Sequence, residues 1–573
     1  MNIFENYLIK IKDLVERNSG SLNIKLPENF RGVTVETPPE NFDFDLSCNI
    51  ALVLGKKHKV NPIKLAENVR IVLKKEIKDF ELIDIANPGF LNIKLNDEVL
   101  KKSILKISQL KKAYGSNNKK KSYNIEFVSA NPTGPMHVGH CRGAVYGDVL
   151  SNLLKFNGNK VTKEYYVNDC GVQIANFTKS VFLRIKEIKL KEKFPNDPNL
   201  YPGDYIIDIA KKILNTDPNI TLDNFKKIYD FLYQESLKHS MSLIKSDLNE
   251  LGIKHDEFYY ESNLSKSNLV SKTVELLEKK NFVVNGFLNP PKGEEIKNWK
   301  KIKRLIFKST NFGDDSDRAL QKNDGSWTYF ANDLAYHAKK VSRNYDYLIN
   351  ILGADHTGYT KRIKAAVSAL SDSKITLECK VCQLVKLYKD GKPFKMSKRS
   401  GDFISAKDLL KEVNKDSIRF MMLNRSNDVE LDFDFDKVLE KSKDNPVFYV
   451  QYCYARINSL FRSLNLGLND EIKFNDNFQP NIFEKKLLRK IFNWPKVVDT
   501  SSIKLEPHRI PFYLYDLSTL FHSYWSKGNE DENFKFIING KVKNINTLGI
   551  IKLVAVVIEN GMKILGVSLP KKM

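Results

Sequence analysis

Long hydrophobic runs and cysteines are both scarce in this chain of 573 residues. No run of about 18 apolar residues occurs, and the longest candidate, 548–558, is short and carries Lys552, so the sequence predicts no membrane span. The six cysteines show no regular spacing, which excludes a disulfide framework and favours a reducing, cytoplasmic compartment. Residues 1–18 have scattered charges and no apolar core, unlike a secretory signal. We therefore expect a cytoplasmic protein with no membrane partner.

A protein-bound metal is not expected either. Cys379 and Cys382 form the one Cys-x-x-Cys pair, and no second pair or nearby histidine supplies the other two ligands of a zinc site. Residues i and i+3 of a strand point to opposite faces. The pair is therefore interpreted as two strand cysteines.

The composition indicates a large folded protein with an excess of positive charge. Apolar residues make up 42 % of the chain, with 34 Phe and 24 Tyr, which excludes a largely disordered protein. The length predicts two to four domains. Lys plus Arg number 92 against 69 Asp plus Glu, a net charge of +23 that favours a polyanionic partner, most simply nucleic acid. A composition rich in Lys, Asn and Ile is the alternative explanation of that charge, which therefore does not decide alone.

The hydrophobic pattern divides the chain into three parts. Residues 1–112 mix helical and strand patterns, and the polar, basic stretch 115–122 is typical of a linker. A strand at 124–128, a helix at about 140–156 and a strand at 161–167 form a βαβ unit, the start of a doubly wound parallel sheet. A second series lies downstream, with strands expected at 327–331, 347–352 and 375–388 and helices at 333–341 and 359–370.

These patterns predict an α/β multidomain protein. Its central part, 120–415, is expected to be a Rossmann-like, doubly wound parallel sheet split by a mostly helical insertion at about 178–320. We expect an α+β domain at 1–112 and an all-α domain at 416–573, with a core at about 445–573.

The first motif is the segment 130–140, ANPTGPMHVGH. It joins a strand to a helix through a turn that contains Pro132 and Gly134, and His137 and His140 open the helix. Backbone N–H groups at a helix N-terminus, together with imidazoles, suit a phosphate that gains charge in a transition state. Gly139 would let a nucleotide approach the backbone closely. Two polar histidines at a helix cap are the plainer interpretation of this pair alone.

The second motif is the segment 392–401, KPFKMSKRSG. A loop with two ammonium groups, Lys395 and Lys398, can close over a triphosphate and neutralise the leaving pyrophosphate. Taken alone, it is more simply a basic surface loop of a lysine-rich chain.

Together the two motifs resemble the paired HxGH and KMSK signatures of class I aminoacyl-tRNA synthetases. In that family both loops hold ATP during adenylation of the amino acid. Val138 and Arg399 are mild departures from the usual residues. The resemblance implies catalytic roles for His137, His140, Lys395 and Lys398. It also implies an ATP site that contains Pro132, Gly134, His137, Gly139, His140, Asp355, Met396 and Ser397.

The sequence around the motifs is similar to that of the arginyl-tRNA synthetases, and the resemblance runs through nearly the whole chain. It is carried by EFVSANPTGPMHVGH at 126–140, WTYFANDLAY at 327–336, LGADH at 352–356 and DSIR at 416–419, which departs from the family's DALR at two positions. A guanidinium needs planar carboxylate partners. The resemblance implies that Glu126 and Asp333 read this charge, that Tyr329 packs against the arginine side chain, and that Ser129, Asn131 and His140 hold its backbone end, with His356 nearby.

The RNA contacts are expected in the C-terminal part. Tyr449, Tyr452 and Arg456 lie on one predicted helix, and unpaired bases stack on aromatic rings beside arginine. From spacing alone a helix-core edge is the simpler interpretation. The resemblance places an anticodon-binding domain here and a domain that contacts the tRNA elbow at 1–112.

The resemblance thus implies a ligase that uses ATP with Mg²⁺, L-arginine and tRNA(Arg), acts as a monomer and activates arginine only when tRNA is bound. A synthetase for glutamate, glutamine or cysteine is less consistent with an acidic pocket and with the lack of zinc ligands. A tRNA-binding paralogue without activity has no reason to keep both signatures. A nucleotidyltransferase outside translation would leave the helical C-terminal domain without a role.

Overall fold

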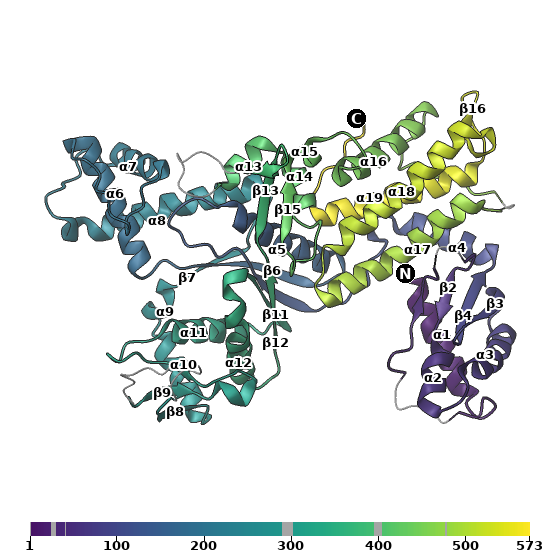
Figure 1. Cartoon of the computed structure of the whole chain (residues 1–573), viewed down its shortest axis with the longest axis horizontal. Helices are drawn as coiled ribbons and strands as arrows, with labels where there is room; N and C mark the ends of the chain where they lie inside the picture. Colours follow the sequence, from purple (N-terminus) through teal and green to yellow (C-terminus); the bar gives the residue numbers. More distant parts are fainter. Residues whose placement is uncertain (1, 25–29, 40–41, 289–301, 395–403, 476–477) are drawn as a thin grey trace. The chain divides into compact units, whose positions relative to one another are not determined.

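The computed structural model describes residues 2–24, 30–39, 42–288, 302–394, 404–475 and 478–573. The chain forms two compact units (Figure 1). One unit comprises residues 119–440, and the other comprises residues 1–118 together with 441–573. None of the described helices is long and apolar enough to cross a membrane.

A five-stranded parallel sheet forms the centre of the unit 119–440. Its strand order is β12-β11-β5-β6-β7, and every neighbouring pair is parallel. The chain therefore adds β6 and β7 on one side of β5 and then β11 and β12 on the other, as in a doubly wound sheet. The switch point lies between β5 and β11, where ligands bind in such sheets. The strands are β5 (Ser122–Glu126), β6 (Lys160–Val167), β7 (Glu257–Tyr260), β11 (Tyr347–Gly353) and β12 (Thr376–Cys382).

Helices connect these strands, and small sheets flank them. The helices are α5 (Val138–Phe156), α6 (Val172–Leu190), α7 (Asp204–Thr216), α8 (Phe225–Glu250), α9 (Ser262–Lys266), α10 (Leu269–Lys279), α11 (Tyr329–Val341), α12 (Thr360–Leu370), α13 (Ala406–Glu412), α14 (Lys415–Met421) and α15 (Phe435–Leu439). An antiparallel sheet contains β8 (Val283–Gly286), β9 (Arg304–Phe307) and β10 (Arg318–Ala319), and a mixed one contains β13 (Val385–Lys389), β14 (Lys392–Pro393) and β15 (Leu431–Asp434).

Three sequence predictions within this unit need correction. The segment 327–331 is not a strand, because the Thr328 side chain caps α11 by accepting a hydrogen bond from the Ala331 N–H at 3.3 Å. The expected insertion 178–320 contains β7, a strand of the main sheet that pairs with β6. The predicted strand 375–388 is two strands, β12 and β13, which belong to different sheets. Both cysteines of the Cys-x-x-Cys pair lie in β12, as predicted.

Residues 416–440 belong to the unit of the central sheet, whereas the sequence predicted them to be part of the C-terminal helical domain. β15 pairs in parallel with β13, and the compact unit extends to Glu440. Arg419, the last residue of the DSIR tetrapeptide, is only 1 % exposed. Its guanidinium donates to Asp148 Oδ2 on α5 at 2.5 Å and to the Leu251 carbonyl at 3.0 Å. This arginine therefore anchors α14 to the helix that begins at His137.

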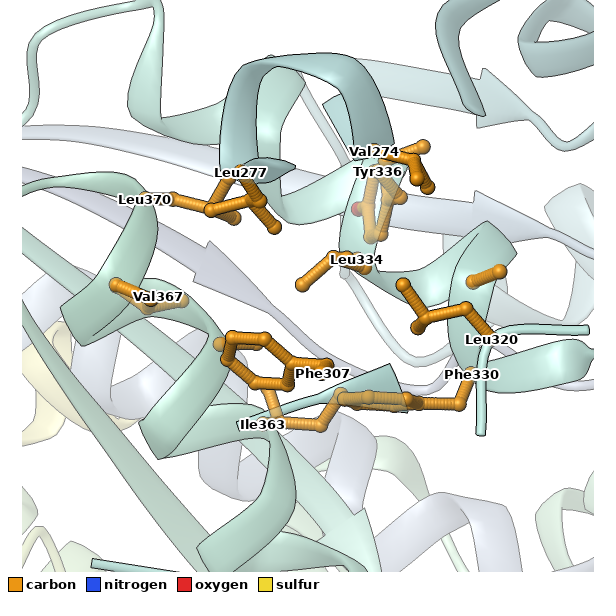
Figure 2. Close-up of a cluster of buried hydrophobic side chains, with 14 of the residues drawn as sticks. Val274, Leu277, Phe307, Leu320, Phe330, Leu334, Tyr336, Ile363, Val367 and Leu370 are labelled. Carbon is orange, nitrogen blue, oxygen red and sulfur yellow. The ribbon is translucent and has the colours of Figure 1, made fainter. Parts of the chain in front are cut away.

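A hydrophobic cluster fixes α11 against the sheet (Figure 2). Leu334 lies near the middle of the cluster, between Tyr336 on one side and Phe307 and Phe330 on the other. These buried residues leave the first turns of α11 pointing toward the carboxyl ends of the strands. The fold thereby positions Tyr329 and Asp333 near the switch point.

The second unit contains an α+β part and a helical part, as predicted. Residues 1–118 form an antiparallel sheet of order β1-β2-β4-β3 covered by helices. Its elements are α1 (Ile3–Arg17), β1 (Val35–Glu36), β2 (Leu46–Cys48), α2 (Ile50–His58), α3 (Pro62–Glu76), β3 (Phe80–Ala86), β4 (Phe90–Leu95) and α4 (Asp97–Leu110). The C-terminal part contains α16 (Pro446–Ser463), α17 (Ile482–Lys504), α18 (Arg509–Glu530), the hairpin of β16 (Ile537–Ile538) and β17 (Lys541–Val542), and α19 (Ile545–Leu565).

Candidate active site

The segment between β5 and α5 is a strained turn at the carboxyl edge of the sheet. Val128 and Ser129 have φ angles of 71° and 41°, a region that β-branched residues such as valine rarely adopt. The Tyr165 hydroxyl donates to the Ala130 carbonyl at 2.8 Å and holds the turn against β6. Strain of this kind persists only where the surroundings enforce it, and it is typical of functional sites.

His137 and His140 stack face to face at the start of α5. Their ring centroids are 3.7 Å apart, and His140 Nδ1 accepts a hydrogen bond from the His137 backbone N–H at 3.3 Å. Burial lowers the pKa of His137, and burial together with His137 lowers the pKa of His140 to about 3. His140 is therefore neutral and carries its proton on Nε2, where it can donate to a phosphate oxygen. A side chain at Gly139 would collide with the His137 ring at 2.9 Å, so this stacking requires glycine.

The two signatures meet through the residues that follow the second one. Lys395, Met396, Ser397 and Lys398 lie outside the described residues. The Val138 N–H donates to the Ile404 carbonyl at 2.9 Å, and the Ala406 N–H donates to the Met136 carbonyl at 2.8 Å. Ile404 and Ala406, which follow the second signature in the chain, are therefore joined to the first signature on either side of His137.

A cluster of carboxyl groups, from Glu126, Glu261 and Asp333, lies in the same unit. Asp333 on α11 accepts a hydrogen bond from the Tyr359 hydroxyl. Burial raises the pKa of Asp333 to about 7; the Tyr359 hydrogen bond opposes this rise, and the charges of Glu126 and Glu261 add to it. Glu261, which follows β7 and is 7 % exposed, accepts from Asn332 Nδ2 at 2.9 Å, and burial raises its pKa too. The cluster thus holds carboxyl groups whose charged forms a bound cation would stabilise.

Glu126, expected to read the arginine charge, is paired with other residues of the protein. It is 9 % exposed, and its Oε2 accepts a hydrogen bond from the ammonium group of Lys340, a fully buried residue of α11. Lys340 also donates to Asn350 Oδ1 at 3.0 Å, and Asn350 is the register partner of Glu126 across β5 and β11. The Ser129 hydroxyl donates to Glu126 Oε1 at 3.2 Å. Part of the negative charge of Glu126 is therefore compensated within the protein.

The remaining expected contacts lie around the same edge of the sheet. Tyr329, at the first position of α11, is 70 % exposed, and its hydroxyl lies 4.0 Å from the position that a Cβ at Gly171 would take. Asn131 Nδ2 donates to Gln173 Oε1 of α6 at 2.8 Å. The exposed His356 Nε2 lies 3.3 Å from Asp355 Oδ2 shortly after β11. The ring of Tyr205 on α7 packs close to Gly134.

Sequence reasoning missed Glu261, Lys340 and the loop after β6. Glu261 went unnoticed because β7 was assigned to the helical insertion, although Phe258-Tyr-Tyr260 followed by an acid could have indicated a strand end. No feature of the sequence distinguishes Lys340 from the many other lysines of the chain. The loop at 168–171 contains Asp169, which is buried and accepts from the Ser262 N–H at 2.8 Å.

A second candidate surface lies on α16 and α18 of the other unit. Tyr449, Tyr452 and Arg456 are half-buried. The Arg456 guanidinium donates to the Tyr452 hydroxyl at 2.6 Å and lies 4.8 Å from the centre of the Trp525 ring. His522 is sandwiched between the two tyrosines, and burial lowers its pKa to about 4. These side chains form a cluster of aromatic rings around one guanidinium.

Three features define a class I aminoacyl-tRNA synthetase: the doubly wound sheet, the paired histidines at its first crossover, and the two signatures of the sequence, the first of which is bonded to the residues that follow the second. Family models match three stretches of the chain: "tRNA synthetases class I (R), catalytic domain" at 102–460, "Arginyl tRNA synthetase N terminal domain" at 9–95, and "DALR anticodon binding domain" at 450–573.

Full-length relatives agree with these matches. The chain is 53 % identical over 577 residues to an arginine–tRNA ligase of Pelagibacter ubique and 42 % identical over 593 residues to one of Bartonella tribocorum, with 100 % of both chains covered in each case. The arginyl-tRNA synthetase structure of Thermus thermophilus has the same fold, with a TM-score of 0.74, 18 % identity and 100 % of each chain covered. The chain belongs to the arginyl-tRNA synthetase family.

Proposed function

We propose that the protein is an arginine–tRNA ligase, an ATP-dependent enzyme that forms AMP. The α-carboxylate of L-arginine attacks the α-phosphorus of ATP, giving arginyl-adenylate and pyrophosphate. The 2′-hydroxyl of the terminal adenosine of tRNA(Arg) then attacks the adenylate carbonyl, and AMP leaves. The single observation that carries this proposal is the cluster of carboxyl groups with raised pKa, Asp333 and Glu261, in the same unit as the stacked His137 and His140.

Asp333 and Glu261 are the groups that recognise the guanidinium in this proposal. Each carboxyl group has an elevated pKa, so a bound cation would stabilise its charged form and gain affinity from it. The exposed ring of Tyr329 covers the aliphatic part of arginine. Glu126, whose negative charge is partly compensated by Lys340, adds a weaker attraction for the guanidinium.

The backbone end of arginine is assigned to Ser129, Asn131 and His140, with His356 at the rim. These residues come from the strained turn and from the segment after β11, on the two sides of the switch point. The α-carboxylate would thus be held next to the ATP site, which is the geometry that adenylation requires.

The ATP site is assigned to the signature turn. Neutral His137 and His140 donate hydrogen bonds to phosphate oxygens at the start of α5, and Lys395 and Lys398 neutralise the departing pyrophosphate. Mg²⁺ would enter with ATP and be held mainly by phosphate oxygens and water. The other proposed contacts are Pro132, Gly134, Gly139, Asp355, Met396 and Ser397.

The polyanionic partner is tRNA(Arg). The face of Tyr449, Tyr452 and Arg456 offers rings and a guanidinium on which unpaired bases stack. A net charge of +23 favours binding of the phosphate backbone. We further propose a cytoplasmic monomer in which bound tRNA is required before arginine is activated.

The test is ATP–pyrophosphate exchange by the purified full-length protein with each amino acid in turn, with and without total tRNA. Exchange with arginine alone, and only when tRNA is present, is expected. Exchange with glutamate, glutamine or cysteine would overturn the pocket assignment. Tight tRNA binding without exchange for any amino acid would identify a non-catalytic paralogue instead.

A further inference from the structure

The helical segment between β6 and β7 reaches the signature turn through Asp247 of α8. Asp247 Oδ2 accepts a hydrogen bond from the Met136 backbone N–H at 2.9 Å. Both residues are buried, and Asp247 is 5 % exposed. Met136 directly precedes His137, so this carboxylate holds the peptide group that leads into the paired histidines.

Both backbone polar groups of Met136 are hydrogen-bonded. Asp247 binds its N–H, and the Ala406 N–H binds its carbonyl at 2.8 Å. The next N–H, that of Val138, is bound by the Ile404 carbonyl. Of these three partners, only Asp247 acts through a side chain, and it is therefore the contact that a single substitution can remove.

The helical segment touches the turn at a second point as well. A Cβ at Gly134 would come within 3.0 Å of the Tyr205 ring on α7. Two helices, α7 and α8, thus support the turn at Gly134 and Met136, although neither helix contributes a proposed substrate contact. A loop of this length needs such support, because an unsupported backbone would leave the histidines poorly oriented.

We propose that Asp247 is a positioning residue for the ATP-binding turn: it fixes the Met136 peptide and thereby the imidazoles of His137 and His140. This inference rests on the proposed function, in which those imidazoles bind the phosphates of ATP. Asp247 itself lies behind the turn and acts through it.

The experiment compares Asp247→Ala and Asp247→Asn in steady-state aminoacylation, with ATP and arginine varied separately. Alanine leaves the buried Met136 N–H without its acceptor, so kcat/KM for ATP should fall about ten- to a hundredfold. The arginine KM should change less than about twofold. Asparagine keeps an acceptor oxygen at the same place, and kcat/KM for ATP should recover to within about threefold of the parent enzyme.

The control variant is Asp256→Ala, at an exposed position. Asp256 Oδ2 accepts a hydrogen bond from the Lys163 N–H at 2.8 Å, so this variant loses the same kind of bond away from the signature turn. Its kcat/KM for ATP should stay within about twofold. Thermal unfolding midpoints and the fraction of active enzyme, measured for all variants, separate a general loss of fold from a specific effect on ATP.

A pH profile gives a readout that does not depend on the alanine variant folding. Charged groups facing Asp247 are Glu250 on its own helix and Lys407 and Asp408 on α13, and burial is the main reason that its pKa is raised to about 6. A protonated carboxyl group, like asparagine, keeps one acceptor oxygen, so acidification through that pH should lower kcat/KM for ATP in the parent enzyme by no more than about threefold. Asp247→Asn should lack this component.

Three outcomes would overturn the inference: an unchanged kcat/KM for ATP in Asp247→Ala, an asparagine variant as impaired as alanine, or the same acid limb in Asp247→Asn and the parent. A parent enzyme without arginine-dependent activity would refute the proposed function instead, before any variant is compared.

Discussion

The hydroxyl of Tyr359 donates a hydrogen bond to Oδ2 of Asp333, and this is the interaction that opposes the effect of burial on the Asp333 carboxyl group. The bond joins α11 to the segment after β11, on either side of the pocket proposed for arginine. Because this bond lowers the pKa of a carboxyl group proposed to bind arginine, it should affect the pH at which arginine affinity is lost.

The arginine KM should rise as the pH falls through about 7. The raised pKa of Asp333 means that its carboxylate is present above that pH and is lost below it, and a guanidinium binds the ionised form. The rise should approach about tenfold per pH unit. In Tyr359→Phe the opposing hydrogen bond is gone, so the break in the profile should move to higher pH. Identical profiles for the two enzymes would contradict this assignment.

Asp333→Asn should raise the arginine KM by at least about thirtyfold. Removing one partner of a desolvated charge pair costs about 2–5 kcal/mol in binding. The KM for ATP should change far less in the same assay. Asp315→Asn is the control, because Asp315 pairs with Lys361 at the surface. Kinetics like those of the parent would show that the carboxylate is misplaced.

Lys340→Met should destabilise the unit 119–440. The substitution leaves Glu126 buried without its cation, a change that costs about 3–5 kcal/mol. The double variant Lys340→Met/Glu126→Gln should recover much of this loss, since it removes the unpaired charge. Thermal unfolding followed by circular dichroism measures both, and Lys339→Met, at the exposed neighbouring position, is the control. A single variant as stable as its control would refute the importance of this ion pair.

Arg456→Ala should raise the KM for tRNA and spare the KM for arginine. The guanidinium contacts Tyr452 and Trp525, and stacking of a base on such a face contributes about 1–3 kcal/mol. The expected change in tRNA KM is about five- to a hundredfold, measured by aminoacylation with varied tRNA. Arg462→Ala, at an exposed position of the same helix, should have a much smaller effect. An equal effect of both substitutions would favour general electrostatic attraction over stacking.

The sequence predicted the architecture well where the pattern is local. The βαβ unit around His137 appeared because an apolar strand, a Pro/Gly turn and a 3.6-residue period follow one another closely. The strand at 257–260 is not predictable from the sequence, because four residues give too little periodicity and its partner β6 is distant in sequence. The supposed strand at 327–331 failed for a different reason: the Thr328 cap decided between helix and strand.

The candidate site was predictable in its motifs but not in its supporting residues. His137 and His140 are recognisable from their spacing, whereas Lys340, Glu261 and Asp247 are ordinary charged residues until the fold buries them. Burial is what raises the pKa of Asp333, and burial of a polar residue is a property of tertiary packing. Sequence alone therefore identified the chemistry but not the groups that tune it.

The central position of β5 affects how the chain is made. Ser122, at the head of β5, binds Asp346, just before β11, and the two residues are 224 positions apart. A ribosome that adds about 5–20 residues per second needs about 10–45 s to deliver this partner. During that time β5 can pair with β6 but exposes its other edge, which leaves this strand open to mispairing on the nascent chain. Asn124 and Glu126 are polar residues of β5, and such residues make the strand less prone to aggregate before β11 has been synthesised.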